Sequence, residues 1–172
     1  MEVLERFAQG DLEAFEALFR QFQGEVYGWI VRIVRDRGIA EDLTVETFWR
    51  IYRAHARFYP EGDFGAWARR IATNAAFDHL KTARREVALP DDLAAGAQPN
   101  PAVQREVHER IERAFRELPP RLQVAATLAL VEEESYEQIA EALGISVGAV
   151  KSRIFRAVRL LRRKLKGLSV EP

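Results

Sequence analysis

The amino-acid sequence predicts an all-α fold of two small helical domains joined by a flexible linker. Apolar residues recur at helical spacing along most of the chain, and no stretch alternates apolar and polar residues as a half-buried strand does. Between the two helical parts, residues 86–103 contain three prolines and a glycine and carry no apolar stripe. We therefore expect a first domain over residues 1–86, a linker over 87–103 and a second domain over 104–172.

The first domain is predicted to be helical throughout. Asp11 is the expected N-cap of its first helix, and Gly24 is expected to interrupt that helix weakly. The segment around Gly38 is expected to separate the next two helices, and a turn at residues 60–63 precedes the last one. The apolar stripes place these helices over residues 12–22, 26–34, 40–58 and 64–85.

The second domain begins with a predicted helix over residues 103–118, which Pro119 and Pro120 end. Because proline suits the first turn of a helix, the same pair is expected to start a further helix over residues 121–134. No internal repeat is present in either domain.

A helix-turn-helix is predicted over residues 135–155. Ser135 and Gln138 have the spacing of a capping box, Gly144 suits the C-terminal end of the first helix, and Ser146 can cap the second. From Lys151 to Lys166 the second helix carries basic residues and no acidic one. A plain helical hairpin shares the apolar spacing, but the uniformly basic face favours a helix that lies in the major groove of DNA.

Composition narrows the classes of function. The chain has no cysteine, which excludes disulfides, cysteine-based zinc sites and a cysteine nucleophile. No apolar run is long enough to span a membrane, and the N-terminal residues do not form a signal peptide. Net charge is zero, but basic residues concentrate over 151–166 and acidic residues over 2–46 and 132–141. We therefore expect a cytoplasmic protein that binds DNA weakly alone and well with a larger partner.

Both domains resemble parts of bacterial RNA polymerase sigma factors. The stretch from Gly10 to Phe58, followed by the helix from Phe64 to Arg85, resembles region 2, and the stretch from Leu118 to Leu165 resembles region 4. The absence of anything resembling regions 1.1 or 3 indicates the extracytoplasmic-function (ECF) group. The resemblance implies a protein without catalytic activity or cofactor that directs promoter-specific transcription initiation.

The resemblance implies that the helix over residues 40–58 docks on the β′ clamp helices of core polymerase. Phe48 suits a core position equally well. Family members commonly carry glutamine where this chain has Val45, which makes the role of Val45 uncertain. The positions that match the docking helix are Asp42, Leu43, Glu46, Phe48 and Trp49.

The helix from Phe64 matches regions 2.3 and 2.4, which recognise and melt the −10 element in the family. Trp67 is the candidate wedge or a core residue, Asn74 can hydrogen-bond a base edge, and the loop from Tyr59 resembles the segment that captures a flipped base. Ala68 stands where primary sigma factors carry a second tryptophan, which implies weaker melting. The expected −10 residues are Tyr59, Phe64, Trp67, Arg69, Arg70, Asn74, Lys81, Arg84 and Arg85.

Region 4 resemblance implies that the second helix of the helix-turn-helix reads the −35 element as duplex. Ala149 replaces a threonine common in the family and could touch a thymine methyl group instead. Arg159, Arg162 and Arg163 lie further along and suit phosphates or the polymerase β flap. The expected −35 residues are Ser146, Val147, Gly148, Ala149, Lys151, Ser152, Arg153 and Arg156.

Two other classes of function were weighed. An enzyme is disfavoured because His55, His79 and His108 stand far apart and no serine has a neighbouring base. A free-standing regulator that dimerises on palindromic DNA stays the alternative. The expected partners are core polymerase, promoter DNA and an anti-sigma factor, with a monomeric free chain, no metal and no insertion into membranes.

Overall fold

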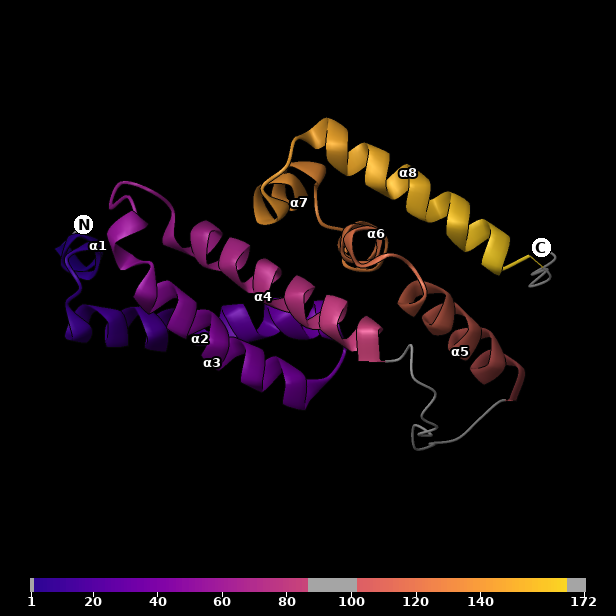
Figure 1. Ribbon diagram of the computed structural model, residues 1–172, viewed down its shortest axis with the longest axis horizontal. Helices are drawn as coiled ribbons and strands as arrows, with labels where there is room; N and C mark the ends of the chain where they lie inside the picture. The colour runs from indigo at the N-terminus through magenta and orange to yellow at the C-terminus, as the bar shows by residue number, and fades with distance from the viewer. Residues whose placement is uncertain (1, 87–101, 167–172) are drawn as a thin grey trace.

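The computed structural model describes residues 2–86 and 102–166, and their side chains over residues 2–84 and 105–166. Within these ranges the chain is helical and contains no strand, so the predicted all-α class is confirmed (Figure 1). Most of the predicted linker, residues 87–101, lies outside the described part. The remaining linker positions 102 and 103 belong to helix α5, so the second helical part begins slightly earlier than expected.

The chain opens with a short helix that the apolar pattern did not predict. Helix α1 (Glu2–Ala8) is followed by a turn at Gly10, whose φ of 87° lies in the left-handed region that glycine adopts without strain. The α1 residue Phe7 is fully buried. Its ring packs among the rings of Phe15, Phe58, Phe64 and Trp67, with centroids 5.6–6.4 Å away.

The expected interruption at Gly24 is wrong. Helix α2 runs unbroken over Leu12–Val34 from its predicted N-cap, Asp11. A glycine within a helix costs only about 0.5–1 kcal/mol relative to alanine, and burial of Val26, Trp29 and Ile30 on the same helix outweighs it. The break comes at Arg35, which has a left-handed φ of 58°.

The predicted break at Gly38 is also displaced. Asp36 accepts a hydrogen bond from the Ile39 backbone N–H and caps α3 (Arg37–Arg53), so Gly38 lies in the first turn of that helix. A short 3-10 turn, η1 (His55–Arg57), takes the place of the predicted last turn of the helix. The predicted turn at residues 60–63 is confirmed by a hydrogen bond from Gly62 N to Tyr59 O, and α4 (Phe64–Glu86) follows as predicted.

The C-terminal part contains α5 (Ala102–Arg116), α6 (Pro120–Ala126), α7 (Tyr136–Leu143) and α8 (Val147–Lys164). Pro120 occupies the first turn of α6, as predicted. The predicted helix over residues 121–134 instead changes to a π-helical turn, η2 (Thr127–Val131), in which Thr127 O accepts from Glu132 N. Helix α4 lies between the α2–α3 pair on one side and α6 and α7 on the other (Figure 1).

A buried hydrogen bond joins α2 to α4. The Trp29 indole N–H donates to Thr73 Oγ1 at 2.8 Å, and that hydroxyl donates in turn to Arg69 O at 2.7 Å. By contrast, Thr47 of α3 is fully buried and its hydroxyl has no hydrogen-bond partner among the described residues. The same residue type therefore occupies a satisfied and an unsatisfied site in one core.

These two threonines should respond oppositely to replacement by valine. Thr73→Val removes the acceptor of a buried indole N–H and should lower the free energy of unfolding by about 1–3 kcal/mol. Thr47→Val removes an unpaired buried hydroxyl and should leave stability unchanged or raise it by up to about 1 kcal/mol. Urea unfolding of both variants measures the difference, and equal destabilisation by the two would contradict the described hydrogen bonding.

Candidate nucleic-acid and polymerase interfaces

The helix-turn-helix forms as its sequence predicts. Ser135 Oγ accepts from Gln138 N at 3.2 Å and the Gln138 side chain accepts from Ser135 N at 3.3 Å, which completes the capping box. Gly144 ends α7 with a left-handed φ of 64°, and Ser146 Oγ accepts from Ala149 N at 3.1 Å to cap α8. Helix α8 is thereby fixed at a defined angle to α7, with the opposite face free.

The free face of α8 carries small, basic and aromatic groups. Phe155 is 64% exposed, and the Arg159 guanidinium lies 5.9 Å from its ring centroid. The Arg156 guanidinium bonds Ser152 O and Oγ at 3.3–3.4 Å, which orients it along the helix. The predicted −35 residues that lie exposed on α8 or at its N-cap are Ser146, Gly148, Lys151, Ser152 and Arg156.

Two predicted −35 residues are less accessible. The Val147 side chain packs partly against the core. Arg153 is half-buried, and this burial, followed by the nearby charges of Arg121 and Arg156, lowers the pKa of its guanidinium. Within residues 2–84 and 105–166 no carboxylate pairs with Arg153. A phosphate oxygen would relieve the repulsion among these three arginines.

Helix α4 presents a narrow exposed stripe of Arg70, Asn74, Asp78 and Lys81, which recur every three or four residues. Arg69 belongs to another face, because its guanidinium lies 5.7 Å from the Trp29 ring centroid and 3.8 Å from a Glu25 carboxylate oxygen.

The remaining −10 predictions divide by burial. Tyr59 is 79% exposed in the turn before α4, whereas Phe64 is only 2% exposed. The prediction that Phe64 contacts DNA is therefore wrong for this conformation, because its ring fills the aromatic core around Phe7. Trp67 is half-buried in that same cluster. The side chain of Arg85 lies outside the described residues.

Helix α3 carries an exposed surface of Asp42, Val45 and Trp49, with Glu46 half-buried beside them. The Arg50 guanidinium bridges Glu46 Oε1 and Asp78 Oδ2 at 2.9 Å each, which links this surface to the exposed stripe of α4.

The docking prediction for Phe48 is wrong for this conformation, because Phe48 is 2% exposed and packs against the rings of Phe15 and Phe19. Leu43 is half-buried against the core. Val45, whose role the sequence left uncertain, is exposed as fully as Trp49 and lies one helical turn from it.

Known proteins match the chain along both helical parts. The family model described as Sigma-70 region 2 matches residues 18–86, and that described as Sigma-70, region 4 matches residues 108–161. RNA polymerase sigma-H factor of Pseudomonas aeruginosa is 34% identical over 181 residues, which cover 97% of this chain and 94% of that protein. ECF RNA polymerase sigma-E factor of Haemophilus influenzae is 33% identical over 180 residues, which cover 96% and 95%. The chain belongs to the ECF group of the sigma-70 family.

As an ECF sigma factor, the chain directs promoter-specific initiation of transcription. A solved structure supports the fold: the sigma factor RpoE from Bartonella quintana, in complex with the anti-sigma factor NepR, superposes with a TM-score of 0.57. It is 22% identical, and the match covers 94% of this chain and 100% of that one. Among the described residues of this sigma factor, no helix is long and apolar enough to cross a membrane.

Sequence reasoning missed Phe155 as a surface residue of this sigma factor. The signal was present, because Phe155 follows Ile154 directly and falls outside the apolar register of Val147, Val150, Ile154 and Val158. An aromatic residue on the polar side of a basic helix has no core to enter and is free to contact a ligand.

Proposed function

We propose that α8 reads the −35 element in the major groove and that α4 with the preceding turn reads the −10 element. The observation that carries this proposal is the free face of α8, where Lys151 and Arg156 flank the exposed Phe155 ring. Cations hold phosphates and set the register, whereas apolar groups contact thymine methyl groups and carry sequence information.

The −10 element is read differently, because its bases are unpaired. The exposed Tyr59 ring provides a surface on which an unstacked base can stack. Asn74 offers both a donor and an acceptor to a base edge, and Arg70 and Lys81 lie on the same stripe to hold phosphates. Trp67 supports this surface from within the aromatic cluster, so melting relies on Tyr59 rather than on an inserted tryptophan.

Core polymerase docks on α3 in this proposal. Val45 and Trp49 supply an exposed apolar centre, and the carboxylates of Asp42 and Glu46 suit a partly basic partner helix such as the β′ clamp. The basic C-terminal half of α8 suits the β flap. The solved relative bound to an anti-sigma factor supports an anti-sigma factor as a further partner. We place the chain in the cytoplasm, without catalytic activity of its own and monomeric when free.

The −35 assignment is tested by removing a single methyl group from DNA. The sigma factor bound to core polymerase is mixed with promoter duplexes in which each −35 thymine is replaced in turn by deoxyuridine. Loss of one buried methyl group should weaken binding by about 0.8 kcal/mol, or roughly fourfold. The Phe155→Ala variant should bind more weakly overall and no longer distinguish thymine from uracil at one position.

The matched control is Leu130→Ala, which removes an exposed apolar side chain from η2 rather than from α8. It should keep the full response to deoxyuridine. A Phe155→Ala variant that discriminates thymine from uracil as strongly as the unaltered chain would contradict the assignment.

A further inference from the structure

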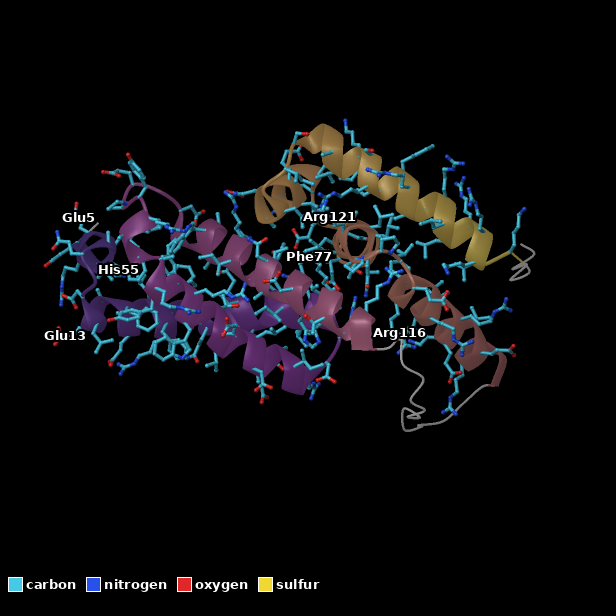
Figure 2. All side chains as sticks on the ribbon, viewed as in Figure 1. Glu5, Glu13, His55, Phe77, Arg116 and Arg121 are labelled. Atoms are coloured by element: carbon cyan, nitrogen blue, oxygen red, sulfur yellow. The ribbon has the colours of Figure 1, made fainter. Side chains whose placement is uncertain are left out.

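The two sigma regions are joined by a continuous apolar seam rather than by the linker alone. Ala72 and Ala76 of α4 are fully buried and belong to one hydrophobic cluster with Leu128 of η2 and Ile139 of α7. Side chains from α4 and α6 fill the space between the regions, near the labelled Phe77 (Figure 2). Alanines allow the helices to approach closely, so this face of α4 is shaped for region 4.

Ion pairs close the edge of the seam. Arg32 Nη1 lies 3.1 Å from Glu134 Oε1, and Arg35 Nη2 lies 2.7 Å from Glu132 Oε1. The side chains of Glu132 and Glu134 are only 16% and 15% exposed, so both carboxylates are largely desolvated. Glu133 between them has a left-handed φ of 54° and is exposed. We call these two arginines and two glutamates the latch.

The seam also occupies cations of the proposed −10 surface. Atoms of the Arg70 guanidinium lie 2.9–3.1 Å from where a Cβ on Gly144 would stand, so Arg70 covers the turn of the helix-turn-helix. Arg84 Nη1 donates to Leu118 O at 3.0 Å. Neither guanidinium can reach a phosphate of the −10 strand without leaving region 4. The −35 face of α8, by contrast, is open.

We propose that the free sigma factor inhibits itself: the latch holds region 4 against α4 and withholds the −10 surface until the chain opens. This inference rests on the −10 role given above to α4. A chain that is open only a fraction of the time binds the −10 strand with an affinity reduced by that fraction. Opening exposes the apolar seam and separates the latch charges, so core polymerase must supply compensating contacts before the −10 surface is available.

Opening can be measured without DNA. Because the chain contains no cysteine, Arg20→Cys on α2 and Arg162→Cys on α8 accept a donor and an acceptor dye at exposed sites. Energy transfer in the free chain should be high and should fall in the Glu132→Gln, Glu134→Gln double variant. The exchange Arg35→Glu with Glu132→Arg should restore it, whereas either reversal alone should lower it.

Masking is then measured with the unlabelled chain and a random-sequence single-stranded DNA oligonucleotide. The Glu132→Gln, Glu134→Gln variant should bind about tenfold more tightly, because loss of both pairs raises the open fraction. The matched control is Glu133→Gln with Glu137→Gln, which removes the same charge from neighbouring exposed glutamates without printed partners in the latch and should bind within about twofold of the unaltered chain.

The outcomes separate the two claims. Unchanged energy transfer in all latch variants would overturn the latch, whatever the role of α4 in DNA binding. A fall in transfer with DNA affinity equal to that of the control would show that the chain opens without unmasking DNA, and this would overturn the −10 role of α4 together with the masking.

Discussion

Replacing Trp49 by alanine is expected to weaken binding to core polymerase by roughly 30-fold or more, which corresponds to about 2 kcal/mol. Trp49 is 57% exposed at the centre of the α3 surface, and its ring is held edge-on by Tyr52 with centroids 6.3 Å apart. A large, oriented aromatic group among near-neutral neighbours is typical of an interface hot spot. Fluorescence titration of labelled sigma factor with core polymerase measures the loss.

The reciprocal control is Phe155→Ala, which should bind core polymerase normally and lose only promoter affinity. Thermal unfolding of Trp49→Ala should change little, because an exposed side chain contributes little to the folded state. Normal polymerase binding by Trp49→Ala would mean that α3 does not dock through this surface.

Replacing Phe7 by alanine is expected to lower the free energy of unfolding by about 3–5 kcal/mol. Phe7 is fully buried and is the residue through which α1 enters the aromatic core. At about 2–4 °C per kcal/mol for a chain of this size, the melting temperature should fall by roughly 10 °C. Calorimetry of the free chain measures the shift.

Val3→Ala provides the control on the same helix, because Val3 is 40% exposed. It should change stability by less than about 0.5 kcal/mol. Equally small shifts from both variants would show that α1 does not complete the core, and an equally large loss from both would indicate general fraying of the N-terminus.

Helix ends were predictable where a single residue type satisfies backbone groups locally. Asp11, Ser135 and Ser146 cap the helices that their positions predict, and Gly144 ends α7. The same local rules failed at Gly24, because the burial of α2 against its neighbours outweighs the small helical cost of one glycine.

Features that depend on tertiary contacts could not be predicted. Helix α1 is too short to show a periodic stripe and is held by the burial of Phe7. The apolar spacing of α3 did not decide whether Phe48 or Trp49 faces the core, since both flank its apolar side; contacts with Phe15 and Phe19 decide it. The seam between α4 and region 4 was equally hidden, because alanine carries no strong signal of its own.

The most direct test of the account is transcription by core polymerase on a promoter library randomised across both elements, with the transcripts sequenced. With this sigma factor present, we expect starts only downstream of two short conserved elements at fixed spacing. Asn74→Ala should relax the downstream element alone, and Phe155→Ala the upstream element alone. Transcripts without an upstream element, or a chain that ignores polymerase and binds palindromic duplex as a dimer, would contradict the account.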